Sequence, residues 1–143
     1  IGSLNLIKKK KLKKDLLVTN CDILSNFDLY DFYNFHKEKG FDITIVASDK
    51  KYIIPYGVCN ISKNGRLIKV QEKPSLDFLV NIGIYLLNKK VLKLISKNKA
   101  CDTNQLINLA RKKGFKVGVF PVSDTNWSDI GQWSEFSKLE NNI

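Results

Sequence analysis

A short apolar segment, a helical pattern and a second apolar segment constrain the fold of this chain more than any other feature. Residues 16–19 read Leu-Leu-Val-Thr, which is typical of a strand buried on both faces of a sheet. Asp28 then begins a helix as its N-cap, and Gly40 ends that helix. A second strand is expected at residues 43–47. This order predicts a right-handed βαβ unit and therefore an α/β protein.

The rest of the chain alternates short strands with short helices. Asn-Gly at 64–65 separates two alternating segments, 54–61 and 67–74, and predicts a β-hairpin. No internal repeat or linker interrupts the pattern, so residues 1–143 are expected to form one domain. The other expected elements are an amphipathic helix at 2–14, strands at 80–87 and 116–122, helices near 91–95 and 106–110, a loop at 127–131 and a closing helix with Trp133 and Phe136.

Charge and cysteine content exclude several classes of protein. The net charge is +10, yet Arg66 and Arg111 are the only arginines, and arginine is the usual reader of bases and phosphates. We therefore expect no specific nucleic-acid partner. Three widely spaced cysteines and one histidine argue against a disulfide framework and a structural zinc site. No apolar run reaches the ~20 residues of a membrane span, so a cytoplasmic protein without a membrane partner is expected.

Polar residues stand at the ends of four expected strands. Asp22 follows the first strand, and Asp129 lies in the loop after the last one. Glu-Lys-Pro at 72–74 ends the hairpin, and Asn-Ile-Gly-Ile-Tyr at 81–85 lies in the next strand. Two carboxylates at strand ends suit Mg²⁺, and a nearby lysine would neutralise a phosphate. Each motif also has an ordinary alternative, as a turn, a solvated strand end or a bulge.

Three further side chains receive ordinary roles from their local context. His36 is interpreted as a surface or half-buried residue of the expected helix. Cys21 is interpreted as a small buried filler, because unpaired cysteines behave as small apolar residues. Trp127 is interpreted as an anchor of the hydrophobic core.

The order of the motifs is more specific than any single motif. Val-Thr-Asn-Cys-Asp-Ile-Leu at 18–24, Ile-Pro-Tyr-Gly-Val at 54–58, the motifs at 72–74 and 81–85, and Trp-Ser-Asp-Ile-Gly at 127–131 follow one another at ordinary spacings. Along nearly its whole length the chain resembles the sugar-phosphate nucleotidylyltransferases. The Asn-Cys-Asp motif and the Trp-x-Asp-Ile-Gly-Gln-Trp ending resemble a branch that serves surface-polysaccharide or sugar-acid pathways.

This resemblance implies a fold and a reaction. The implied fold is a Rossmann-like, three-layer α/β/α nucleotidyltransferase domain, with a mixed, mostly parallel sheet and an inserted β-hairpin. The implied reaction transfers a nucleoside monophosphate from a nucleoside triphosphate to a sugar 1-phosphate and releases pyrophosphate. Catalysis then consists mainly of positioning and charge neutralisation, and a homo-oligomer is compatible with this function.

The resemblance also implies roles for individual residues. Asp22 and Asp129 would be catalytic and would hold the Mg²⁺ ion, and Lys73 would be catalytic by holding the sugar phosphate. The residues expected to contact the sugar are Glu72, Asn81, Gly57 and Tyr56.

One element of the family pattern is absent. The family opens with a strand and a glycine-rich loop that cradles the triphosphate, and this sequence has no such loop. We therefore expect a partial domain whose amino-terminal part is missing, with exposed apolar sheet surface and no useful activity alone. The alternative is a non-catalytic sugar-phosphate-binding or scaffold domain of the same fold, which need not keep Asp22, Lys73 and Asp129.

Overall fold

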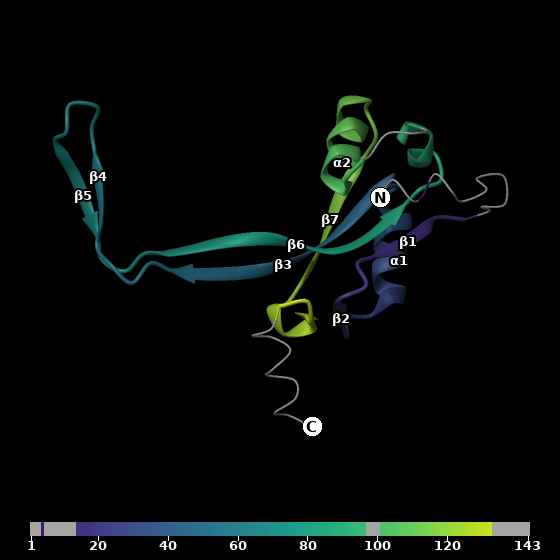
Figure 1. Cartoon of the computed structure of the whole chain (residues 1–143), viewed down its shortest axis with the longest axis horizontal. Coiled ribbons are helices and arrows are strands. Elements are labelled where there is room, and N and C mark those ends of the chain that lie inside the picture. Colours follow the sequence, from purple (N-terminus) through teal and green to yellow (C-terminus); the bar gives the residue numbers. More distant parts are fainter. Residues whose placement is uncertain (1–3, 5–13, 97–100, 133–143) are drawn as a thin grey trace, which may run out of the picture.

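The computed structural model describes residues 4, 14–96 and 101–132, and its centre is a four-stranded sheet (Figure 1). The strands lie in the order β1 (Leu16–Thr19), β6 (Ser75–Leu87), β3 (Ile43–Ile53) and β7 (Val117–Val122). β3 and β7 pair in parallel, whereas β1 and β3 each pair antiparallel with β6. Three strands thus share one direction and β6 opposes them, which confirms the expected mixed sheet.

Two helices begin and end as the sequence predicts. The Asp28 carboxylate accepts two backbone N–H groups at the start of α1 (Leu29–Glu38), and Gly40 follows its end with φ 62°. The positive φ is the left-handed conformation that glycine adopts without strain. α2 (Thr103–Lys112) begins with a capping box at Asp102. The expected helix near 91–95 is a 3-10 turn, η3 (Val91–Leu94).

Helices cover both faces of the sheet, which gives the three expected layers. Successive residues of β6 point to opposite faces, so this strand contributes to two separate cores. The core on the α1 side contains Phe32, Val46, Ile82, Ile84, Leu86 and Val122. The core on the side of α2 and η3 contains Ile43, Tyr85, Leu87, Val91, Leu92, Ile95, Leu106, Ile107 and Ala110.

β3 and β6 continue beyond the sheet as a two-stranded ribbon that ends in a hairpin. The hairpin consists of β4 (Val58–Ile61) and β5 (Leu67–Gln71), and Gly65 in its turn has φ 80°, as the Asn-Gly signal predicts. We call residues 48–80 the arm. Figure 1 shows the arm projecting away from the helices and the rest of the sheet.

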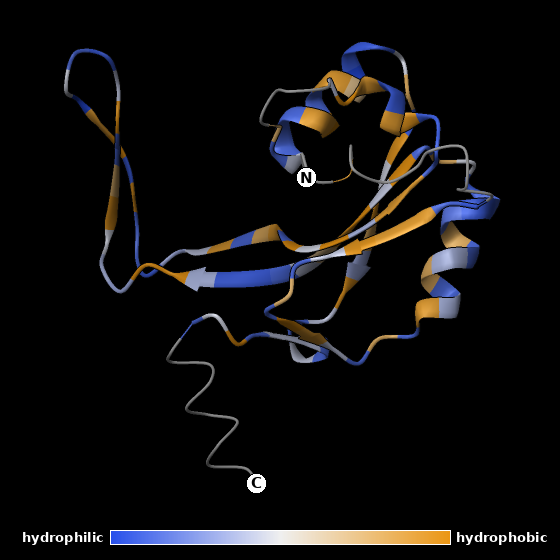
Figure 2. Cartoon of the chain, turned by 45° about the vertical axis from the view of Figure 1, so that its right-hand side comes forward, coloured by the Kyte–Doolittle hydropathy of each residue, from blue (hydrophilic) through white to orange (hydrophobic). Residues whose placement is uncertain are grey.

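The arm is longer than the sequence indicates and carries much apolar surface. The strands expected at 43–47 and 80–87 are too short, because antiparallel backbone pairing continues through residues 48–53 and 75–80. Figure 2 shows hydrophobic residues along the arm. The following apolar side chains of the arm are 44–69% exposed: Ile53, Ile61, Leu67, Ile68, Val70, Leu76, Phe78 and Leu79. Leu17 on the edge strand β1 is 46% exposed. Exposed apolar sheet surface was expected, and it is present.

The loop expected at 127–131 is partly a strand. β8 (Trp127–Asp129) pairs antiparallel with β2 (Ile23–Ser25) and follows the 3-10 turn η4 (Asp124–Asn126). The loop prediction was wrong because each strand has only three residues and its partner is far away in the sequence. Local periodicity cannot detect such a pair.

Two expected helices cannot be compared with the structure. The helix at 2–14 and the closing helix with Trp133 and Phe136 lie outside the described residues, apart from Leu4 and Lys14. Among the helices that the structure does describe, none has the length and apolarity to cross a membrane.

Two ordinary interpretations of single residues were wrong. Cys21 is exposed. His36 is 1% exposed, because α1 packs this face against β3, where Nδ1 lies 2.7 Å from the Thr44 hydroxyl. Its Nε2 lies 3.8 Å from the Asp15 carboxylate, which itself pairs with Lys37 at 3.1 Å. Helical periodicity located this face, but a buried polar partner on a strand leaves no local signal.

The burial of His36 predicts acid sensitivity. Burial lowers the pKa of His36 from 6.5, and the nearby Asp15 carboxylate partly opposes this shift. The unfolded chain then binds the proton more readily, so the free energy of unfolding falls as the pH drops below about 6.5. Urea unfolding between about pH 7 and pH 5 should show a shallower decline for His36→Gln, with a slope difference of at most ~1.4 kcal/mol per pH unit. Equal slopes would contradict this prediction, since no other histidine is present.

Candidate functional site

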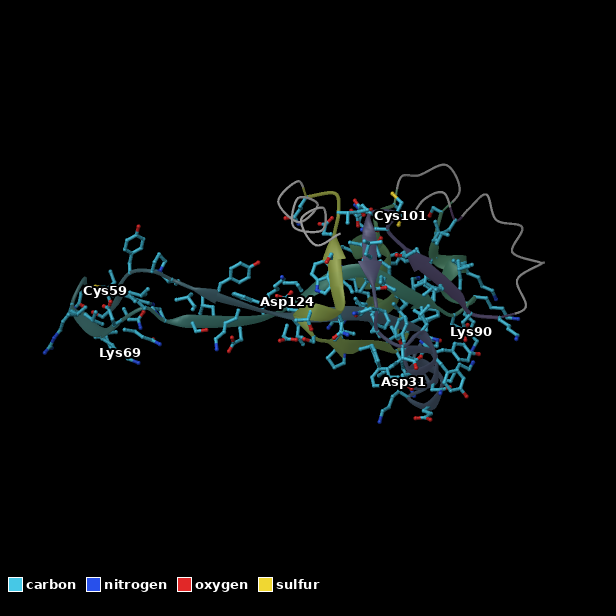
Figure 3. All side chains as sticks on the ribbon, turned by 90° about the horizontal axis from the view of Figure 1, so that it is seen from below. Asp31, Cys59, Lys69, Lys90, Cys101 and Asp124 are labelled. Atoms are coloured by element: carbon cyan, nitrogen blue, oxygen red, sulfur yellow. The ribbon has the colours of Figure 1, made fainter. Side chains whose placement is uncertain are left out.

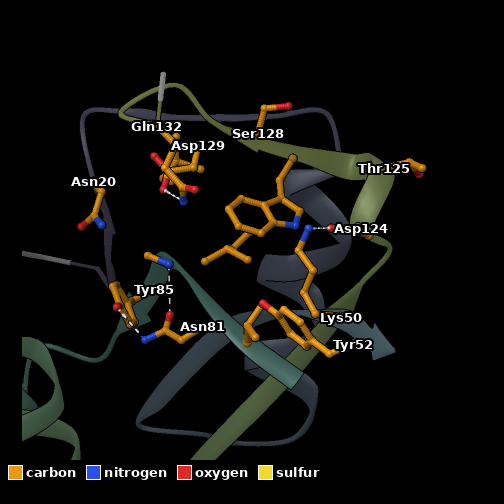
Figure 4. A pocket seen from close by; sticks show the side chains of 15 residues that line it. Asn20, Lys50, Tyr52, Asn81, Tyr85, Asp124, Thr125, Ser128, Asp129 and Gln132 are labelled. Carbon is orange, nitrogen blue, oxygen red and sulfur yellow. Dashed lines mark hydrogen bonds and ion pairs between the residues drawn. The ribbon is translucent and has the colours of Figure 1, made fainter. Parts of the chain in front are cut away.

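A cavity of about 770 Å³ lies where the sheet meets the β2–β8 pair (Figure 4). Its walls come from the end of β1, the middle of β3 and β6, and the η4–β8 segment. Polar side chains dominate the lining: Asn20, Lys50, Asn81, Asp124, Asp129 and Gln132. Such a lining suits a polar, multiply hydrogen-bonding ligand better than an apolar one.

Asp22 and Asp129 meet at Gly131 beside this cavity, and Asp129 is one of its lining residues. Asp22 lies in the turn between β1 and β2, and β8 ends at Asp129, opposite Ile23. A Cβ atom on Gly131 would lie 2.8 Å from Asp22 Oδ2 and 3.1 Å from Asp129 Oδ1. The two carboxylates therefore face the same small space, and a side chain at position 131 would collide with both.

Backbone and side-chain amides fix the pair. The N–H of Ile130 donates to the Asp22 carbonyl at 2.9 Å. The Gly131 N–H donates to Asp129 Oδ1 at 3.1 Å, and Gln132 Nε2 donates to Asp129 Oδ2 at 2.8 Å. These hydrogen bonds use only part of the acceptor capacity of the two carboxylates, so lone pairs remain available for a further ligand.

The donor set of this pair fits Mg²⁺. Both side chains offer hard oxygen ligands, and magnesium typically takes one or two carboxylates and completes its shell with water or phosphate oxygens. No cluster of three or more metal-ligating side chains occurs among the residues that the structure describes. A dedicated zinc or calcium cage therefore finds no support there, whereas a shared site completed by a phosphorylated ligand is compatible with the pair.

Asn81 lies on the cavity wall in a fixed orientation. Its Oδ1 accepts the Gly83 N–H at 3.0 Å, and its Nδ2 donates to the buried Tyr85 hydroxyl at 2.9 Å. Gly83 has φ 85°, and the strand register shifts here, so the bulge interpretation of this motif is confirmed. The role of Asn81 in a site stays a prediction. The Asn20 side chain packs on Gly83, 2.5 Å from the position of a Cβ atom.

The other candidate residues gather at the far end of the ribbon. A Cβ atom on Gly57 would lie 3.1 Å from Glu72 Oε2, and Tyr56 beside it is 75% exposed. Pro74 is buried, and its carbonyl accepts the Ile54 N–H at 3.0 Å.

Lys73 has an unusual backbone conformation. Its φ is 42°, and it is the one non-glycine residue with positive φ in the described part of the chain. Left-handed backbone costs an ordinary L-residue about 1 kcal/mol, and such strain is found preferentially at functional sites.

The structure thus divides the candidate residues into two groups. Asp129 and Asn81 line the cavity, and Asp22 lies beside it, where it faces Asp129 at Gly131. Tyr56, Gly57, Glu72 and Lys73 lie on the arm and do not line the cavity. Figure 3 shows the same separation, with Cys59 and Lys69 on the hairpin and Asp124 of the cavity wall well apart.

Sequence reasoning missed several residues of the cavity wall. Lys50, Tyr85, Asn20 and Gln132 all line it. Tyr85 and Asn20 belong to motifs that the sequence analysis quoted, so their proximity to Asn81 and Asp22 was a usable signal. Lys50 lies in a run of polar residues, which is typical of a solvated strand end. Only the three-dimensional structure shows that its side chain lines the cavity.

Comparison with known proteins agrees with this geometry. The family described as nucleotidyl transferase matches residues 2–143. Mannose-1-phosphate guanylyltransferase 1 of Arabidopsis thaliana is 32% identical over 138 residues, which cover 92% of this chain and 37% of that protein. A putative mannose-1-phosphate guanyltransferase of Sulfolobus acidocaldarius is 36% identical over 150 residues. The match covers 96% of this chain and 38% of that protein. The chain thus spans well under half the length of these curated relatives.

Solved structures share the fold. The crystal structure of HddC from Yersinia pseudotuberculosis matches 96% of this chain with a TM-score of 0.64 at 18% identity, and 59% of that chain is covered. A putative glucose-1-phosphate thymidylyltransferase from Bacillus anthracis matches the same share with a TM-score of 0.60, and 56% of that chain is covered. The expected three-layer fold and the expected family are therefore confirmed, and the chain belongs to the nucleotidyl transferase family.

Proposed function

We propose that this chain forms the metal- and sugar-phosphate-binding part of a sugar-1-phosphate nucleotidylyltransferase. The observation that carries the proposal is the meeting of Asp22 and Asp129 at Gly131, beside a polar cavity that Asn81 also lines. In the reaction, an oxygen of the sugar phosphate forms a bond to the α-phosphorus of a nucleoside triphosphate. The bond from this phosphorus to the β-phosphate bridging oxygen breaks, and pyrophosphate leaves with the electron pair.

Each candidate residue has a task that suits its chemistry. Asp22 and Asp129 would hold Mg²⁺, which supplies charge neutralisation between the phosphate groups when it is bound. Lys73 would bind the sugar phosphate through a charge-assisted hydrogen bond. Glu72 would accept hydrogen bonds from sugar hydroxyls, and Asn81 would orient the sugar in the cavity.

The arm carries the other residues that we propose to contact the sugar. Tyr56 would cover the sugar ring with its exposed aromatic face, and Gly57 leaves its backbone open beside the Glu72 carboxylate. Substrates are then a sugar 1-phosphate and a nucleoside triphosphate. We place the reaction in the cytoplasm and its product in surface-polysaccharide synthesis, and a homo-oligomer would agree with the exposed apolar arm.

One observation favours a second candidate function. Lys73 on the arm does not line the cavity that Asp129 lines, as expected of a scaffold domain that binds a sugar phosphate without catalysis. Retention of both carboxylates at one point argues for the enzyme. Pyrophosphate release from GTP in the presence of mannose 1-phosphate or glucose 1-phosphate, measured on the protein as the cell makes it, separates the two functions.

The carboxylate pair generates a prediction about metal binding. In the protein as the cell makes it, Asp22→Asn and Asp129→Asn should each weaken Mn²⁺ binding, measured by electron paramagnetic resonance, and should lower pyrophosphate release about 100-fold or more. Each substitution removes one of two charged ligands while keeping the shape of the side chain. Asp31→Asn on the exposed start of α1 is the matched control and should change neither quantity. If either site variant binds Mn²⁺ with unchanged affinity, that aspartate is not a metal ligand and is an ordinary turn residue.

The backbone of Lys73 allows its side-chain role to be separated from its conformation. Lys73→Ala should weaken sugar 1-phosphate binding about tenfold or more, because a hydrogen bond to a charged group is worth ~1.5–3 kcal/mol. Lys73→Gly should lose the same affinity but unfold at no lower urea concentration than Lys73→Ala, because glycine relieves the positive φ. Isothermal titration with mannose 1-phosphate and with GTP makes the comparison.

Lys73→Ala should lower the affinity for mannose 1-phosphate far more than the affinity for GTP. Lys69→Ala, on the exposed strand β5, is the matched control and should bind both ligands normally. Wild-type affinity in Lys73→Ala would remove this residue from the site.

A further inference from the structure

The carboxylate pair sits on a small structural unit of its own. β2 and β8 form a two-stranded sheet that is separate from the four-stranded sheet in the described residues. Each strand has three residues, and their register places Ile23 opposite Asp129. Strand pairing therefore fixes Asp22 and Asp129 relative to each other, but it does not fix them relative to Asn81 on β6. Other contacts must set the width of the cavity.

Lys50 supplies one such contact from the four-stranded sheet. Its Nζ forms an ion pair with Asp124 Oδ1 in η4, and it lies 5.4 Å from the centre of the Trp127 ring (Figure 4). The Lys50 side chain is 33% exposed, so much of its stem packs against protein. Asp124 and Trp127 precede Asp129 on the same segment.

Lys50 lies on β3 at a point where it can connect the arm to the β2–β8 unit. Lys50 lies opposite Phe78, where β3 has left the sheet and begins the arm. Trp127 packs at the edge of the core on the α1 side, together with Ile23 and Phe27. The β2–β8 unit is thus held by apolar packing on one side and by Lys50 on the other.

We propose that Lys50 and Asp124 form a clasp that sets the position of Asp129 against the wall with Asn81. Both are positioning residues, because neither is assigned to substrate or metal. The clasp joins Lys50 at the base of the arm to the segment that carries Asp129. It therefore links the candidate residues on the arm to those at the cavity. The metal assignment in this proposal rests on the proposed function, whereas the clasp itself rests only on the ion pair and the ring contact.

Charge and position make opposite predictions for one variant. Lys50→Met removes a positive charge from the cavity wall, and by Coulomb attraction alone it would strengthen cation binding at Asp129. A loosened β8 segment would instead weaken cation binding, because its two ligands must be held together. Asp124→Asn weakens binding on either account, so the sign for Lys50→Met decides.

Hydrogen exchange tests the clasp without any metal. The amides to follow are Ile130, which donates to the Asp22 carbonyl at 2.9 Å, and Asn26, which donates to the Asn126 carbonyl at 3.0 Å. In Lys50→Met and in Asp124→Asn, these two amides should exchange with solvent about three- to fivefold faster than in the unchanged protein. This factor agrees with the loss of a partly exposed ion pair. Amides of α2 should keep their rates. Lys51→Met, the neighbouring residue opposite Asp77, is the matched control and should leave all rates unchanged.

Rescue and metal affinity complete the test. The double variant Lys50→Asp with Asp124→Lys should restore slow exchange, and Mn²⁺ affinity should fall about three- to fivefold in both single variants. Exchange rates in Lys50→Met equal to those in Lys51→Met would overturn the clasp, as would a rise in Mn²⁺ affinity in Lys50→Met. If Mn²⁺ does not bind the unchanged protein but the exchange rates respond as stated, the proposed function fails and the clasp stands.

Discussion

The structure depends on the burial of β6 between β1 and β3. This strand is covered by α1 on one face and by α2 and η3 on the other, so its alternate residues enter both cores. It is also the only antiparallel member of the four-stranded sheet in the described residues, which lets β1 and β3 run in the same direction with α1 between them in sequence. The shift of register at Gly83 then turns Asn81 toward the cavity instead of continuing a regular ladder.

The arm follows from the same pairing. Once β3 and β6 are in register at the sheet, backbone hydrogen bonding continues outward although the side chains no longer find a core. A two-stranded ribbon alone is marginally stable, and the exposed apolar residues along it do not find a covering surface within the described ranges. The strained turn at Lys73 lies at the end of this ribbon, so its position relative to Asp129 depends on the stiffness of the strands between them.

Local sequence signals predicted the elements that local interactions define. The cap at Asp28, the Asn-Gly turn at Gly65 and the apolar runs of β3 and β7 each leave a short-range pattern, and these elements are confirmed, although β3 continues beyond its expected end at residue 47. The failures have a common cause, because each depends on contact with another element of the fold. β2 pairs with the distant β8, and His36 of α1 contacts Thr44 of β3. The candidate site residues came from the resemblance of ordered motifs. That resemblance identified Asp22 and Asp129 as a pair but could not show that Lys50 closes the wall behind them.

Assembly of the carboxylate pair, the proposed metal site, depends on the least local part of the fold. Asp22 leaves the first strand of the described chain and Asp129 ends the last one, so their meeting at Gly131 requires nearly the whole chain to be in place. Two like charges at one point disfavour this arrangement until a cation offsets their repulsion. A cation that binds only the folded pair stabilises the folded state by mass action. Under the proposed function, metal binding would support β2–β8 pairing. The packing of Trp127 and the proposed contact of Lys50 would then reduce the stabilisation that the metal has to supply.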